Sequence, residues 1–211
     1  MMLIATSWDD GLVTDLRLVN ILDKYSASAS FAINSRLHGR IPVLNDVRSG
    51  SVFGYKLTRL DLLALYPYDI CNHLPYHEQI NVVDDSRVLG IIEDGKKDLE
   101  DMFGREVPGI VWPYGVSTVL SNESARLAGH LYGRDAINNQ PGIDRWNIRP
   151  IDWRVDPEDI IDRGCDVVLF GHTYELAGEC DWDYLDEIYR IYSSDHRCEL
   201  VNMSQLMVSY D

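Results

Sequence analysis

Short, uninterrupted apolar runs alternate with amphipathic segments along most of this 211-residue chain. Runs such as residues 2–6, 68–72 and 165–171 lack the in–out alternation of a sheet that has one wet face, so they are typical of strands buried on both sides. Apolar residues at helical spacing separate them, for example over 14–25 and 84–103. This order is the signature of a parallel sheet wrapped by helices, and the sequence therefore predicts an α/β fold.

The remaining segments continue the same rhythm. Residues 36–56 are irregular and rich in glycine, which predicts a long loop or a small insertion. No internal repeat or linker divides the chain, so a single domain over 1–211 is expected. Further strands are predicted at 26–34, 109–112, 131–138 and 198–201, and further helices at 57–66, 121–129 (with Ser121 or Asn122 as N-cap), 156–164 and 182–194.

Composition narrows the class of protein. Hydrophobic residues make up 45% and charged residues 25%, as in a soluble globular protein with a sizeable core. The net charge of −15 argues against nucleic acid and against an anionic membrane surface as partners, because both are bound through clustered Lys and Arg. Four cysteines without a CxxC pair predict reduced, mostly buried thiols. No apolar stretch is long enough for a membrane span.

Four of the apolar runs end in chemically capable side chains, within the segments SWDDG, NHLPYH, WPYG and GHTYE. The carboxyl ends of parallel strands meet at one edge of a sheet or barrel, where the connecting loops converge. We therefore expect Asp9, Asp10, His73, His77 and His172 to lie on the same rim. Pro75 predicts that the histidine pair sits where a loop enters a helix.

Two histidines and one carboxylate form a three-ligand set that leaves a position for water, as in catalytic zinc sites. A second carboxylate can act as general base and a further histidine as general acid. Each element also has a purely structural interpretation. Asp9–Asp10 can be a capped turn, like the second such pair at Asp84–Asp85, His172 can be a hydrogen-bonded core residue, and PYG can be a plain turn. The coincidence of four strand ends favours a site.

The four segments together resemble the motifs of the NodB-homology polysaccharide deacetylases, carbohydrate esterase family 4. SWDDG is similar to their aromatic-Asp-Asp-Gly motif, NHLPYH to Asn-His-x-x-x-His, WPYG to the segment ending in Pro-Tyr-Gly, and VVLFGH to the final histidine motif. The resemblance extends from residue 3 to about residue 207. It implies a distorted (β/α) barrel of about seven parallel strands.

The resemblance also assigns roles to residues. It implies that Asp9 is the general base, that His172 is the general acid, and that a divalent metal is held by Asp10, His73 and His77. Tyr114 would offer its backbone N–H to the oxyanion, and Trp112 and Tyr114 would line the sugar site. The implied cofactor is Zn²⁺, although two imidazoles and a carboxylate also accept Co²⁺, Ni²⁺ or Fe²⁺.

Two departures from the family pattern stand out. The family's third motif carries an arginine that steadies the base, whereas this chain has Val111 and Trp112 there, and Arg134 is our candidate substitute. The family's Trp-x-x-Asp motif has a match at Trp153 to Asp156, but Asp156 is equally well explained as a helix N-cap.

The implied activity is metal-dependent hydrolysis of N-acetyl groups on an N-acetylated sugar or polysaccharide, in which metal-bound water attacks the amide carbonyl. Two alternatives stay open: a hydrolase of another non-peptide C–N bond on the same barrel, and a non-catalytic carbohydrate- or metal-binding module. The amino terminus has no basic segment followed by a long apolar run, so the sequence as given predicts a cytoplasmic protein. An export signal removed from this sequence would instead place it outside the cytoplasm.

Overall fold

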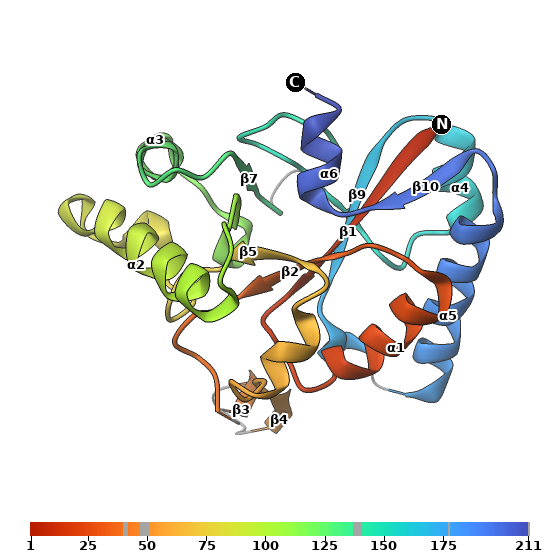
Figure 1. Ribbon diagram of the computed structural model, residues 1–211, viewed down its shortest axis with the longest axis horizontal. Coiled ribbons are helices and arrows are strands. Elements are labelled where there is room, and N and C mark those ends of the chain that lie inside the picture. Colours follow the sequence, from red (N-terminus) through yellow and green to blue (C-terminus); the bar gives the residue numbers. More distant parts are fainter. Residues whose placement is uncertain (40–41, 47–50, 137–140, 177, 211) are drawn as a thin grey trace.

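The computed structural model describes residues 1–39, 42–46, 51–136, 141–176 and 178–210. Its strands are β1 (Met2–Asp9), β2 (Ser30–Ile33), β3 (Pro42–Asp46), β4 (Ser51–Tyr55), β5 (Asp69–Asn72), β6 (Gly109–Val111), β7 (Tyr132–Arg134), β8 (Ile151–Asp152), β9 (Val167–Gly171) and β10 (Cys198–Val201). Its α-helices are α1 (Asp15–Tyr25), α2 (Asp85–Phe103), α3 (Val119–Leu127), α4 (Pro157–Arg163), α5 (Glu179–Ser194) and α6 (Met203–Val208). Figure 1 shows their arrangement.

Seven strands form a curled half-barrel in the order β7-β6-β5-β2-β1-β9-β8, and each neighbouring pair is parallel. The predicted distorted (β/α) barrel is therefore confirmed. Strand β1 is the branch point of the sheet. One of its edges pairs with β9, while the other pairs with β10 over Met2–Ala5 and with β2 over Ser7–Asp9. The carboxyl end of β1, which carries Asp9, therefore lies between β2 and β9.

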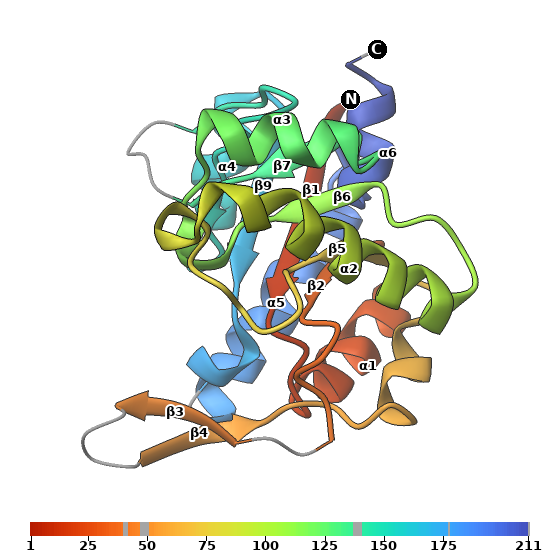
Figure 2. The ribbon, with the colours of Figure 1, turned by 90° about the vertical axis from the view of Figure 1, so that its left-hand side faces the viewer.

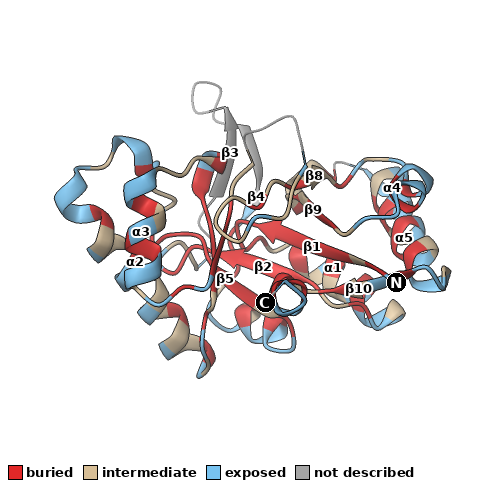
Figure 3. Cartoon of the chain, turned by 90° about the horizontal axis from the view of Figure 1, so that it is seen from above, coloured by how far each residue is buried: buried red, intermediate tan, exposed pale blue. Residues whose placement is uncertain are grey.

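Side-chain alternation along the strands divides the core into layers. On β1, Ile4 and Trp8 join the cluster that packs under α1 and α5, whereas Ala5 joins the cluster inside the curl, which α6 closes with Met203. Figure 3 shows the buried central strands and the exposed outer faces of α2 and α3. Successive residues of a strand point to opposite faces, so the inner face of each strand is fixed by these inner-cluster residues.

Several expected elements differ in detail. Segment 57–66 contains a 3₁₀ turn at Asp61–Leu65 instead of an α-helix, and the irregular 36–56 segment contains the antiparallel hairpin β3–β4. Helix α3 begins earlier than predicted because Thr118, not Ser121 or Asn122, is its N-cap and exchanges hydrogen bonds with Ser121. The segment after β10 forms α6, and neither this helix nor β8 was predicted.

The four thiols are free: Cys71 and Cys198 are buried, whereas Cys165 and Cys180 are exposed. Burial is thus predicted correctly for two of them. Among the described residues, no helix combines the length and the apolar character that crossing a membrane requires.

Candidate active site

The predicted site residues meet at the carboxyl ends of the strands. Ala5, Cys71 and Val168 belong to the inner cluster. Because side chains two positions apart share a face, the same alternation directs Asp9 and His73 toward the interior of the curl. The fold thereby brings together residues from opposite halves of the sequence.

Asp10, His73 and His77 form a compact group of potential metal ligands. One ligand atom from each lies within 4.8 Å of the others. The Nε2 atoms of His73 and His77 are 4.0 and 3.7 Å from Oδ1 of Asp10. The two imidazole rings are 4.8 Å apart between centroids. These are separations that a single divalent ion can bridge after small side-chain adjustments, because bonds to zinc are about 2.0–2.2 Å long.

The histidines present unprotonated nitrogens to this group. His73 Nδ1 lies 2.8 Å from the carbonyl oxygen of Val111, which can only accept, so Nδ1 carries the proton and Nε2 has a free lone pair. Burial lowers the pKa of His73 to about 4. Burial also lowers the pKa of His77. Both imidazoles are thus neutral near pH 7, which is the form that binds a metal.

The loops around these candidate ligands have unusual backbone conformations. Asp10 has φ 85°, Leu74 φ 58°, His77 φ 59° and Tyr114 φ 59°, all in the left-handed region. Such conformations cost roughly 1–3 kcal/mol each and cluster at functional sites. They also explain why the predicted helix after Pro75 is absent: Leu74 and His77 turn the chain back, and the next helical element is the 3₁₀ turn Ile80–Val82.

Arg134 contacts the second carboxylate. Its Nη2 donates to both oxygens of Asp9, at 2.6 Å for Oδ1. Both side chains are buried, and the guanidinium lies over the Phe170 ring at 5.2 Å. The structure thus places Arg134 against Asp9, the carboxylate with which the sequence analysis paired it. Among the described residues, Nε and Nη1 of Arg134 have no hydrogen-bond partner, so Asp9 is its one polar contact there.

His172 lies between two aspartates, Asp9 and Asp10, on one side and Glu175 on the other. Its Nε2 is 4.0 Å from Oδ2 of Asp9 and 4.0 Å from Oδ2 of Asp10. Its Nδ1 bonds Oε1 of Glu175 at 3.1 Å, and Trp153 Nε1 donates to Oε2 of the same carboxylate. A Cβ on the preceding Gly171 would come within 2.2 Å of the Trp153 ring, so only glycine allows this approach.

The charges around His172 favour its protonated form. Burial alone would lower the pKa of His172, but the hydrogen bond to Glu175 and the charges of Asp9 and Asp10 raise it above its usual value. The pKa of Asp10 shifts in the opposite direction. Burial would raise the pKa of its carboxyl, but the Lys56 ammonium and the neighbouring histidines hold that pKa far below its usual range. The site therefore combines an ionised Asp10 with a readily protonated His172.

The two aromatic residues assigned to the sugar site have different positions. Tyr114 is 58% exposed and its ring lies 4.7 Å from that of His77, so it borders the candidate ligands. Trp112 is only 1% exposed and packs with Ile110 under α2 and α3. Alternation along β6 turns Val111 inward and Trp112 outward, so the geometry gives no support to the predicted place of Trp112 at the sugar site.

Sequence reasoning missed two polar partners of the site. Glu175 stands three residues after His172 within GHTYE, a spacing visible in the sequence but not weighed. Lys56 follows the β3–β4 hairpin, and nothing local indicated that its ammonium reaches Asp10. The ambiguous Trp-x-x-Asp match is resolved as a cap, since Asp156 accepts from Glu158 N at the start of α4.

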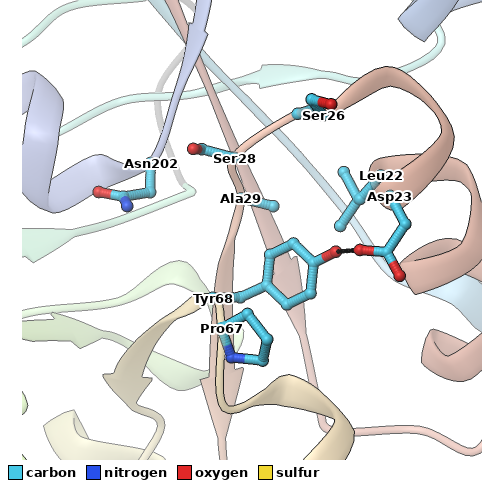
Figure 4. Close-up of a pocket in the computed structure, with 9 residues that line it drawn as sticks. Leu22, Asp23, Ser26, Ser28, Ala29, Pro67, Tyr68 and Asn202 are labelled. Carbon is cyan, nitrogen blue, oxygen red and sulfur yellow. Dashed lines mark hydrogen bonds between the residues drawn. The ribbon is translucent and has the colours of Figure 1, made fainter.

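A separate pocket lies away from this rim. This cavity, of about 260 Å³, is lined by the end of α1, the residues just before β2 and β5, and Asn202. Tyr68 donates a hydrogen bond to Asp23 there (Figure 4), with 2.6 Å between the oxygens. The cavity lies at the amino ends of those strands, whereas the ligand group lies at their carboxyl ends. None of the predicted site residues lines it.

Comparison with known proteins identifies the family. A family model described as polysaccharide deacetylase matches residues 2–133, which include three of the four motifs. The chain belongs to the polysaccharide deacetylase family. Members of this family are hydrolases that act on carbon–nitrogen bonds other than peptide bonds. A search of curated proteins found no significant match.

Solved structures similar to this polysaccharide deacetylase-family chain share its fold. A putative polysaccharide deacetylase from Mycobacterium smegmatis is 15% identical, with 99% of this chain and 89% of that one covered and a TM-score of 0.71. A peptidoglycan deacetylase from Bacillus subtilis is 20% identical, with 99% of this chain and 91% of that one covered and a TM-score of 0.61. A family 4 carbohydrate esterase from Streptomyces lividans, solved with acetate, is 13% identical, with 93% of this chain and 90% of that one covered and a TM-score of 0.60.

Proposed function

We propose that this protein is a metal-dependent N-deacetylase that acts on an N-acetylated sugar or polysaccharide. The observation that carries the proposal is the convergence of Asp10, His73 and His77 beside a buried Asp9 and a carboxylate-bonded His172. Family membership supports the reaction class. The arrangement provides a ligand set, a base and an acid on one rim, which hydrolysis of an amide requires.

The donor set fits a divalent transition metal. Two neutral imidazole nitrogens and one ionised carboxylate suit zinc, and three protein ligands leave a position for water or substrate. The hydrogen bond that His73 Nδ1 donates to Val111 O fixes the orientation of this imidazole. When bound there, the ion would polarise the acyl carbonyl and lower the pKa of the attacking water.

Asp9 is the proposed proton acceptor. Its carboxylate is buried, accepts a hydrogen bond from Arg134 and lies 4.0 Å from His172 Nε2, on the same rim as the ligand group, so it could take a proton from a water molecule there. Asp10 is committed to the ligand group and to Lys56, which leaves Asp9 as the carboxylate available for proton transfer. General bases contribute about 10²- to 10⁴-fold to such reactions.

His172 is the proposed proton donor to the leaving amine. Glu175 holds its Nδ1, so that Nε2 points to the aspartates and can hand a proton to the sugar nitrogen. Water adds to the carbonyl carbon, the C–N bond breaks, and acetate and a free amine result. The Tyr114 backbone N–H would stabilise the oxyanion, and the exposed Tyr114 ring would border the sugar.

Replacing Glu175 with Gln should shift the alkaline limb of the pH–kcat profile to lower pH. The parent His172 has a raised pKa, so its acid form persists until the pH rises through that value. The amide removes the negative charge that helps to raise it, and the acid form is then lost earlier. Acetate release measured across pH tests this. The control is Glu179→Gln, which changes an exposed residue paired with Arg17 and should leave the alkaline limb in place. An alkaline limb that does not move in Glu175→Gln would refute the assignment of His172 as proton donor.

Acetate release from chito-oligosaccharides, measured with added Zn²⁺ or Co²⁺, tests the proposed activity. We expect metal-dependent turnover that stops when a chelator is added. Turnover of small cyclic amides or imides, with none on acetylated sugars, would instead support the other C–N hydrolase. Metal binding without turnover of any acetylated sugar would support the non-catalytic module.

A further inference from the structure

We propose that Lys56 is a positioning residue that holds the Asp10 ligand in the geometry needed for metal binding. The inference rests on the proposed metal site and extends it to a residue outside the four motifs. Lys56 lies directly after β4, is 5% exposed, and reaches the ligand group from the β3–β4 hairpin.

The Lys56 ammonium is fully hydrogen-bonded within the site. Its Nζ lies 2.6 Å from the carbonyl oxygen of Asp10, 2.9 Å from Oδ1 of Asp10 and 2.8 Å from Oδ1 of Asn34. An ammonium has three donors and no acceptor, so these three oxygens satisfy it completely. Such a buried, saturated cation is fixed in position.

Two of these contacts clamp a single residue. By binding both the backbone carbonyl and the carboxylate of Asp10, Lys56 closes a ring that fixes the side chain relative to the backbone. Asp10 has φ 85°, a conformation that an L-residue keeps only when its surroundings enforce it. The oxygen that Lys56 holds, Oδ1, is also the Asp10 oxygen within 4.0 Å of both His73 Nε2 and His77 Nε2.

The third contact extends the clamp to the histidine loop. Asn34 follows β2, and its Nδ2 donates to the carbonyl oxygens of His73 at 2.6 Å and Leu74 at 3.3 Å. A continuous chain therefore runs from Asp10 through Lys56 and Asn34 to His73. It ties together the carboxyl ends of β1, β2 and β5, and so sets the spacing between the carboxylate and the first imidazole.

The backbone around Lys56 is anchored to the loop that follows Asp10. Val13 N donates to Tyr55 O at 2.8 Å, and Leu57 N donates to Gly11 O at 2.9 Å. Figure 2 shows the β3–β4 hairpin projecting from the body of the molecule, with its base beside this loop. These two hydrogen bonds, one on each side of Lys56, hold its backbone beside the loop that follows Asp10.

A positioning role of Lys56 and a purely electrostatic role predict opposite effects of its removal on metal affinity. A nearby ammonium repels a divalent cation, so if charge alone mattered, a neutral replacement would bind metal more tightly. If Lys56 positions Asp10, its removal should weaken binding by about 10- to 100-fold, as loss of an outer-shell partner of a ligand does. The sign of the change separates the two.

The test compares Lys56→Met and Asn34→Ala with the parent. Zinc affinity is measured by competition with a chromophoric chelator, and ligand geometry by the visible absorption of the Co²⁺-loaded protein. We expect zinc binding about 10- to 100-fold weaker in Lys56→Met and weakened in Asn34→Ala, with an altered cobalt spectrum in both. The matched control is Lys96→Met, which removes another lysine–carboxylate pair, with Glu100, on α2. It should match the parent.

Each outcome decides a different claim. Lys56→Met that binds zinc as tightly as the parent, or more tightly, overturns the positioning role while the metal site stands. Parent protein that binds no zinc overturns the metal site and, with it, the role of Lys56. Thermal unfolding shows whether Lys56→Met is folded. If it is not, Asn34→Ala is the deciding variant. An unchanged zinc affinity and an unchanged cobalt spectrum in Asn34→Ala would then overturn the proposal.

Discussion

Replacing His77 with Ala should remove zinc from the protein and lower acetate release by on the order of 10³-fold or more. His77 Nε2 lies 3.7 Å from Oδ1 of Asp10, and its loss leaves two ligands, Asp10 and His73, where catalytic zinc needs three. Polarisation of the carbonyl by a metal is worth several kcal/mol, and each 1.4 kcal/mol corresponds to about tenfold in rate. Zinc content by elemental analysis and initial rates together measure the effect.

The control for this variant is His196→Ala, because the His196 side chain is 95% exposed and distant in sequence from the motifs. It should keep its zinc and its rate. A chelator should reduce the parent to the level of His77→Ala, and zinc added back should restore the parent but not the variant. Full zinc content and full activity in His77→Ala would contradict the assigned ligand set.

Replacing Asp9 with Asn should lower kcat by about 10²- to 10⁴-fold while zinc binding is retained. The amide cannot accept the proton of the attacking water, which removes the general base. Asp10, His73 and His77 are unaltered, so the ligand set remains. The amide oxygen still accepts a hydrogen bond from Arg134, which keeps that guanidinium partnered. Rates and zinc stoichiometry measured on the same preparation separate catalysis from binding.

Asp84→Asn is the matched control, since Asp84 belongs to the other Asp–Asp pair and caps α2 by accepting from Ser86 N. It should leave kcat unchanged. The Asp9→Asn variant loses the charge of a buried ion pair, so its folding must be checked by chemical unfolding before rates are compared. A folded Asp9→Asn protein with the parent rate would show that another group is the base.

The sequence predicted the rim of the site because that prediction needs only two local features. Apolar runs locate buried strands, and the polar residues after Asp9, Asn72 and Gly171 mark the ends that a parallel sheet brings together. The burial of Trp112 could also have been predicted from the sequence. If Val111 faces the inside of the curl, its neighbour must face outward, so strand alternation alone excludes Trp112 from the interior of the curl.

Other features depend on packing that no local pattern encodes. Arg134 and Asp9 are 125 positions apart, and no local pattern pairs them; the one sequence feature that indicates a substitute is the absence of the family's motif-three arginine. Lys56 reaches Asp10 because a hairpin inserted after β2 returns the chain to the loop beyond β1, and its length and course cannot be derived from composition. The helix predicted at 57–66 is shortened to a 3₁₀ turn although the apolar spacing of this segment suits an α-helix.

The most direct test of the proposed metal site is an anomalous difference map, at the zinc absorption edge, from crystals grown with zinc. We expect one peak about 2.0–2.2 Å from Oδ1 of Asp10 and from Nε2 of His73 and His77, with Asp9 and His172 outside bonding distance. A map with no peak between these three atoms, from protein that is folded and saturated with zinc, would contradict it.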